Sequence, residues 1–166
     1  ILGHWWGKHA PGVTDPTAAL AAAHHLLLSH GKVVQAYREM GLTGQVGITL
    51  NMTPVYPAAD NAADRQAAAR EDAFINGWYA EPVFTGRYPA DLWEAFAQEL
   101  EMPEIMPGDM ETISAPIDFL GINYYFPTYV KADPGSPYGA NRIDSGREKT
   151  AMGWEGYAGG LYDLLV

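Results

Sequence analysis

The chain has 166 residues, of which 48% are hydrophobic, so it can bury a core and is too apolar for a disordered protein. Its net charge of −10 argues against a nucleic-acid partner, because phosphates need a basic surface. No apolar run approaches the roughly 18 residues of a membrane span, and the absence of cysteine excludes disulfides and thiolate metal sites. We expect a globular protein with no membrane partner. The absence of cysteine and of a basic leader is compatible with a cytoplasmic location.

Residues 1–14 are rich in Gly, Pro and aromatic side chains, and they predict a loop. Asp15 followed by Pro16 is typical of a helix start, with Asp as the N-cap and Pro at the first helical position. We expect this helix to continue to about Met40, because Gly41 is a common residue just past a helix end.

The next elements are a strand, an extended segment and a second helix. Residues 46–50 alternate apolar and small side chains and predict a strand that leads into Asn51. Residues 53–57 are predicted to be extended, because the residue before each proline is excluded from the helical region. An Ala-rich helix is predicted over residues 62–79, with Glu81-Pro82 as its stop signal.

The remaining elements end in a long Pro- and Gly-rich segment. We expect a third helix over residues 90–100, a short helical turn at 108–113 and a buried strand over 117–124. Residues 126–153 predict a long loop without regular structure, which is unusual in a compact domain and suggests a functional loop or lid. A last helix is predicted from about Gly159.

Polar side chains follow both predicted strands where each strand ends. Asn51 follows the first strand, and Asn123, Tyr124 and Tyr125 follow the second, with helices between them. Strand, helices and strand in this order are typical of a parallel α/β sheet or barrel, which keeps its chemistry at the carboxyl ends of its strands. The alternative is that both Asn residues merely cap their strands.

The sequence contains no self-evident acid/base pair, because no acidic residue falls at a predicted strand end beside a second carboxylate. The helical His24, His25 and His30 do not share one face at metal-ligand spacing, so we interpret them as structural or solvent-facing and expect no metal site. Neither a phosphate-binding glycine loop nor a nucleophile elbow occurs.

Several aromatic residues fall in predicted loops, where they would be partly exposed. Trp5, Trp6 and Trp154 are of this kind, and His4 and His9 lie in the same first loop as two of them. Exposed aromatic rings often stack on sugars or other flat ligands, and they equally often pack beneath loops. Both interpretations stay open at this point.

Six stretches stand out along essentially the whole chain. They are Gly3-His4 with Lys8-His-Ala-Pro-Gly12, Ala23-His-His-Leu-Leu27, Gly47-Ile-Thr-Leu-Asn-Met-Thr-Pro54, Phe84-Thr-Gly-Arg-Tyr-Pro89, Asp118-Phe-Leu-Gly-Ile-Asn-Tyr-Tyr125, and Met152-Gly-Trp-Glu155 with Gly160-Leu-Tyr162. Together, and in this order and spacing, they resemble the family 1 glycoside hydrolases, the bacterial β-glucosidases in particular.

The resemblance implies an internal portion of a (β/α)8 TIM barrel, about strands 5 and 6 with their helices and a long loop. Residues 1–166 would lie within a single catalytic domain. The family cleaves β-glucosides by a retaining mechanism with two Glu residues, one in an Asn-Glu-Pro motif and one in a Thr-Glu-Asn-Gly motif. Neither motif occurs in the sequence, so we expect no catalytic residue within it.

The resemblance also implies roles for seven residues. Tyr125 resembles the tyrosine that hydrogen-bonds the nucleophile, and Asn123 resembles the polar residue two positions before it. Asn51 resembles a strand-5 residue that faces the sugar or the leaving group. The remaining residues resemble contacts to the aglycone or the entrance wall: His9, Trp154, Trp5 and Trp6.

The implied partner is a β-glucoside or small oligosaccharide, and no cofactor is implied. Two barrel strands without their neighbours leave unpaired edges, so we expect self-association or binding to a complementary barrel fragment. Two alternatives stay open: an inactive barrel fragment with a structural or weak sugar-binding role, and an unrelated α/β scaffold that shares the motifs.

Overall fold

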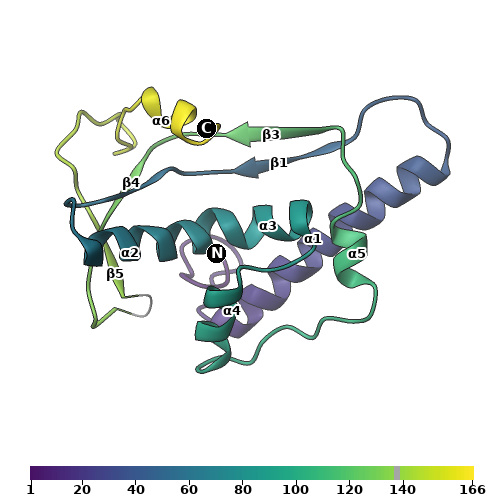
Figure 1. Ribbon diagram of the computed structural model, residues 1–166, viewed down its shortest axis with the longest axis horizontal. Coiled ribbons are helices and arrows are strands. Elements are labelled where there is room, and N and C mark those ends of the chain that lie inside the picture. The colour runs from purple at the N-terminus through teal and green to yellow at the C-terminus, as the bar shows by residue number, and fades with distance from the viewer. Residues whose placement is uncertain (137–138) are drawn as a thin grey trace. The chain divides into compact units, whose positions relative to one another are not determined.

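The computed structural model describes residues 1–136 and 139–166, which contain both helices and short strands (Figure 1). The elements are α1 (Pro16–Glu39), β1 (Gly47–Asn51), β2 (Val55–Pro57), α2 (Ala62–Asp72), the π-helix η1 (Ala73–Gly77), α3 (Trp78–Thr85), α4 (Ala90–Ala97), α5 (Asp109–Ile113), β3 (Phe119–Asn123), β4 (Thr128–Ala132), β5 (Ala140–Ile143) and α6 (Gly159–Asp163). This order confirms the predicted α/β class.

The first helix forms where its local signals predict it. The Asp15 carboxylate accepts a hydrogen bond from the Ala18 N–H at 3.1 Å, which satisfies one of the backbone donors left open at a helix start. The chain leaves α1 through Gly41, which adopts a left-handed φ of 66°. Across residues 1–136 and 139–166, neither α1 nor any other helix is long and apolar enough to cross a membrane.

Strands β1 and β3 form a two-stranded parallel sheet. The Asp118 N–H donates to the Val46 carbonyl at 2.8 Å before the two strands, and the Met52 N–H donates to the Asn123 carbonyl at 3.0 Å at their other end. The residue numbers of both strands therefore increase in the same direction, as in a parallel pair, and the two arrows point the same way in Figure 1. Because Asn51 and Asn123 are the last residues of β1 and β3, they lie at the same edge of the sheet.

A second, three-stranded sheet corrects the prediction of a structureless loop over residues 126–153. Strand β4 pairs with β2 in parallel and with β5 in antiparallel orientation, and Val130 is fully buried beneath α2 with Ala67. The prediction was wrong because the Pro, Gly and Ser residues concentrate in the turns around two short strands. Within β4 itself, Thr128 and Val130 are buried and Lys131 is exposed, the alternation of a half-buried strand.

The second helical region does not stop at Pro82, contrary to the sequence prediction. It runs through α2, the π-helix η1 and then α3, which contains Pro82. Pro82 lies inside α3, where its missing N–H removes one hydrogen bond of the helix. Its ring is fully buried, and this packing offsets part of the loss.

The chain divides into two compact units. The first unit comprises Ile1–Ile48 and Tyr79–Leu120, and the second unit comprises Thr49–Trp78 and Gly121–Val166. In the first unit, α1 packs closely on α5, where a Cβ on Gly31 would overlap the Thr112 carbonyl. In the second unit, α2 covers β4 and β2.

Candidate functional site

The second unit gathers four of the seven predicted site residues. Asn51 and Asn123 are exposed at the carboxyl edge of β1 and β3. Two residues further on, Tyr125 is 51% exposed, and its ring contacts Trp154 with centroids 5.3 Å apart at 50°. The structure thus places two amides and an aromatic pair after the same parallel strands, which is where α/β folds bind ligands.

The loop that carries Trp154 is closed by its own hydrogen bonds. The Glu155 carboxylate accepts hydrogen bonds from the Ser145 N–H at 3.1 Å and from the Ser145 hydroxyl. The Trp154 carbonyl accepts the Thr150 N–H at 2.8 Å, and the Thr150 carbonyl accepts the Gly153 N–H at 2.8 Å. These bonds hold the backbone on both sides of Trp154, so its ring has a defined position against Tyr125.

An ion pair lies in the same loop, before Trp154 in the sequence. Lys149 donates to the Asp144 carboxylate, and this bond lowers the pKa of Asp144 and raises the pKa of Lys149. Both side chains are exposed, so the pair adds little to stability and serves mainly to define the loop geometry.

A cluster of tyrosines and one arginine joins this loop to β2 and β4. Tyr56 stacks on Tyr129 with ring centroids 5.2 Å apart, and Arg147 lies over the Tyr157 ring at 4.5 Å. The Arg147 Nε also donates to the Tyr129 hydroxyl at 3.0 Å. Burial, followed by a hydrogen bond to Asp163, raises the pKa of Tyr56 well above its ordinary value. This phenol is therefore neutral at ordinary pH and acts as a donor.

The other three predicted site residues lie in the first unit. Trp5 packs on the buried Phe96 with ring centroids 5.4 Å apart, as an aromatic residue beneath a loop would. Trp6 is half-buried and has the Lys8 ammonium 5.5 Å from its ring centroid. His9 is exposed, and its backbone N–H donates to the Leu2 carbonyl at 3.2 Å.

His24 is structural, one of the two roles that the sequence left open for the helical histidines. It is 1% exposed, with Nδ1 2.9 Å from the Tyr88 hydroxyl and Nε2 3.2 Å from the Asp109 carboxylate. A backbone N–H from Met106 and then the bond to His24 lower the pKa of Asp109. His25, by contrast, is exposed. Within the described residues, no three His, Asp or Glu side chains are grouped to hold a metal ion.

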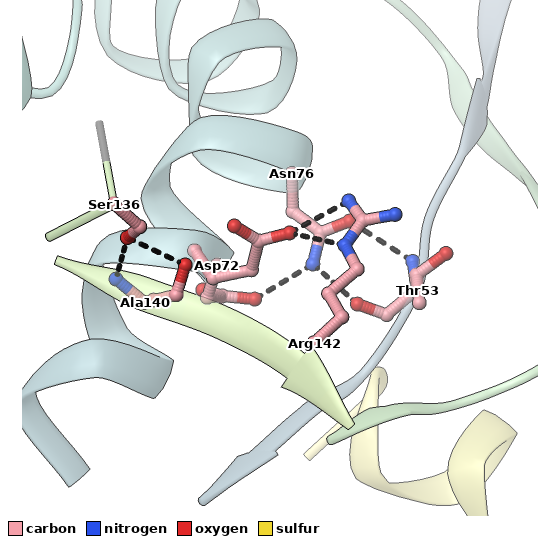
Figure 2. A network of polar contacts seen from close by, with 7 residues as sticks. Thr53, Asp72, Asn76, Ser136, Ala140 and Arg142 are labelled. Atoms are coloured by element: carbon pink, nitrogen blue, oxygen red, sulfur yellow. Dashed lines mark hydrogen bonds and ion pairs between the residues drawn. The ribbon is translucent and has the colours of Figure 1, made fainter. Parts of the chain in front are cut away.

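Sequence reasoning missed Asn76, a buried amide that contacts the chain just beyond Asn51. Figure 2 shows Asn76 of η1 bonded to Thr53 and to Asp72. A polar residue four positions after an acid, in an apolar stretch that includes Phe74 and Trp78, is the signal that could have marked it.

Polar and aromatic side chains at the carboxyl ends of parallel strands are typical of α/β folds, including α/β barrels. The sequence profile described as "Glycosyl hydrolase family 1" matches residues 1–166, and the chain belongs to this family. Beta-glucosidase A of Acetivibrio thermocellus is 44% identical over 172 residues, a match that covers 100% of this chain and 38% of the relative.

Solved structures give the same result. A β-glucosidase from Exiguobacterium marinum superposes with a TM-score of 0.94 at 42% identity, covering 99% of this chain and 38% of that one. The virulence factor SghA of Agrobacterium tumefaciens, determined with its substrate analog salicin, gives a TM-score of 0.92 at 40% identity, with 99% and 37% covered. The chain therefore spans less than two fifths of these relatives. Its fold is part of a (β/α)8 barrel, as the resemblance predicted.

Proposed function

We propose that residues 1–166 form part of the substrate-facing side of a β-glucosidase, a retaining glycoside hydrolase that acts on terminal β-D-glucosides. The observation that carries this proposal is the juxtaposition of exposed Asn51 and Asn123 with the Tyr125–Trp154 aromatic pair. Amides at strand ends suit the hydroxyl groups of a sugar, and an exposed aromatic pair suits a flat or apolar aglycone.

Each residue has a proposed role in this reaction. The Tyr125 phenol donates to the carboxylate nucleophile and stabilises its charge, while Asn123 and Asn51 bind sugar hydroxyls. Trp154 is assigned to the aglycone. For His9 the family resemblance implies an aglycone contact, and for Trp5 and Trp6 a place in the entrance wall, and these three roles stay predictions. Bond cleavage needs two carboxyl groups about 5 Å apart. Neither Glu-bearing motif of the family occurs in residues 1–166, so these residues are assigned binding and positioning only.

The behaviour of the 166 residues by themselves belongs to the same proposal. They make up one portion of a single barrel domain, and the two-stranded β1–β3 sheet has an outer edge on each strand. We expect the chain alone to self-associate or to bind a complementary barrel fragment. A cytoplasmic location is also proposed, supported by the absence of cysteine, and cell fractionation would test it.

A chimera provides the test. Residues 1–166 replace the matched segment of Beta-glucosidase A of Acetivibrio thermocellus. The match includes 100% of the 166 residues. We expect this barrel chimera to hydrolyse p-nitrophenyl β-D-glucoside, and Tyr125→Phe to lower kcat by about tenfold or more, because the charge of the nucleophile loses a donor. The 166-residue chain alone should show no turnover and should elute as oligomers in size-exclusion chromatography.

Two results would overturn the proposal. A barrel chimera that has the circular dichroism of a folded barrel but no turnover would support the alternative, an inactive structural or weakly sugar-binding fragment. Turnover by the isolated 166-residue chain would show that the catalytic carboxyl groups lie within it, contrary to the assignment above.

A further inference from the structure

Thr53 occupies a gap between two strands, directly after the candidate site. It follows Asn51 of β1 by two residues and precedes β2, so it belongs to neither strand. The next residue, Pro54, has no N–H of its own, which limits regular pairing in this segment. The N–H and the carbonyl of Thr53 therefore need partners from elsewhere in the fold.

Asn76 supplies both partners (Figure 2). Its Oδ1 accepts the Thr53 N–H at 3.0 Å, and its Nδ2 donates to the Thr53 carbonyl at 2.7 Å. The amide side chain thus pairs with Thr53 as a neighbouring strand would. The second Nδ2 hydrogen goes to the Asp72 carboxylate at 2.6 Å, one helical turn earlier. Because Asn76 is only 5% exposed, these bonds form largely out of water.

The π-helix explains how a helical residue reaches this position. The Trp78 N–H donates to the Ala73 carbonyl, an i→i−5 bond that widens the turn containing Asn76. Single π-turns inside longer helices are rare and occur frequently at functional sites. Here the π-turn lies between α2 and α3, and its one buried polar side chain among the described residues is Asn76.

The same segment is held from a second side. The Met52 N–H donates to the carbonyl of Asn123, the last residue of β3. Residues 52 and 53, which directly follow Asn51, are thus held between β3 and η1.

We propose that Asn76 is a positioning residue that acts through Thr53 to hold Asn51 in place for the sugar. The kinetic part of this inference rests on the proposed function, whereas the structural part does not. A purely structural Asn76 would lower stability when removed and leave the kinetics of the folded protein unchanged. A positioning Asn76 would change the kinetics, and only while Asn51 is present.

The experiment is a double-mutant cycle in the barrel chimera with Asn76→Ala, Asn51→Ala and the pair. We expect each single substitution to lower kcat/KM for p-nitrophenyl β-D-glucoside by about tenfold to a hundredfold. The double variant should lose no more kcat/KM than Asn51→Ala alone.

The matched control is Asn61→Ala, which removes the N-cap of the same helical region and should lower the melting temperature without changing kcat/KM. If Asn76→Ala does not fold, Asn76→Asp, which keeps the acceptor for the Thr53 N–H, replaces it.

Hydrogen exchange separates this inference from the proposed function. A peptide that contains Met52 and Thr53 should exchange at least tenfold faster in Asn76→Ala than in the parent, and at the parental rate in Asn61→Ala. Unchanged exchange would overturn the positioning role whatever the activity. Additive kinetic losses would overturn the coupling to Asn51. An inactive parent chimera with accelerated exchange would refute the proposed function and the role toward the sugar, and would leave only the structural part, that Asn76 holds residues 52 and 53.

Discussion

The two units bury polar side chains in different ways. In the first unit, His24 lies between the side chains of Tyr88 and Asp109, so the network joins helix α1 to α5 and to the turn before α4. In the second unit, Asn76 and Asp64 bond to backbone groups, at Thr53 and at Ala132 of β4. The first network therefore fixes helices to one another, and the second fixes helices to strand ends.

The aromatic pairs of the two units also differ, in how far the partner ring is exposed. Trp5 of the first unit packs on Phe96, which is 7% exposed, while Trp154 of the second unit packs on Tyr125, which is 51% exposed. A ring against a buried ring contributes mainly to stability, and a ring against an exposed ring leaves surface for a ligand. Substitutions of His24 in the first unit and of Trp154 in the second should therefore separate stability from kinetics.

The largest expected effect is on stability, in the first unit. His24→Leu in the barrel chimera should lower the free energy of unfolding by about 3 kcal/mol, because it removes two buried hydrogen bonds and leaves Asp109 without its imidazole partner. The measurement is urea unfolding followed by tryptophan fluorescence. kcat/KM at 25 °C should stay within about twofold of the parent.

The exposed His25 provides the matched control for this prediction. His25→Leu should change the free energy of unfolding by less than about 0.5 kcal/mol, since its side chain is at the surface of the same helix. Equal effects of the two substitutions, or a large loss of kcat/KM in His24→Leu, would remove the distinction between the units.

A smaller effect, on kinetics, is expected in the second unit. Trp154→Ala should raise KM for p-nitrophenyl β-D-glucoside by about fivefold, close to 1 kcal/mol, because an aromatic contact to the aglycone is lost. Inhibition by deoxynojirimycin, which has no aglycone, should stay unchanged and is measured in the same assay. If the inhibition constant rises in parallel with KM, Trp154 contributes to the sugar side and its assignment is wrong.

Local signals predicted the elements whose causes are local. Asp15, Pro16 and Gly41 set the bounds of α1 through capping and backbone conformation, which depend on neighbours in sequence. The polar residues after two apolar runs likewise predicted that Asn51 and Asn123 end adjacent parallel strands. The family resemblance then supplied the barrel, which no local signal gives.

Contacts distant in sequence account for what could not be predicted. Strand β4 pairs with its neighbour in sequence, β5, and also with β2, which lies more than 70 residues earlier, so one of its two edges depends on a distant segment. Asn76 reaches Thr53, 23 residues away, only through a π-turn that no residue pattern announces. His24 finds its partners 64 and 85 residues later, so its role as a buried structural residue depended on the tertiary fold.

The smallest expected effect is the pH dependence of stability, which should involve both units. Hydrogen bonds from the backbone, first of all from the Ala132 N–H, lower the pKa of Asp64 in the folded state. A carboxyl group whose folded pKa is lowered stabilises the protein above its unfolded pKa of about 3.9, and this contribution is lost as the pH falls through the folded value. Asp64→Asn removes the charge and keeps an acceptor. The difference in urea midpoint between the parent chimera and Asp64→Asn should therefore be widest near pH 7 and should narrow below about pH 4. A difference that stays constant down to pH 2 would mean that Asp64 acts through its shape and hydrogen bonds alone.

Asp109 of the first unit also has a lowered pKa. The difference in urea midpoint between the parent chimera and Asp109→Asn should therefore narrow over the same pH range. In both units the carboxylate charge would then act on stability in the same way, and the units would differ only in what their buried polar groups hold in place.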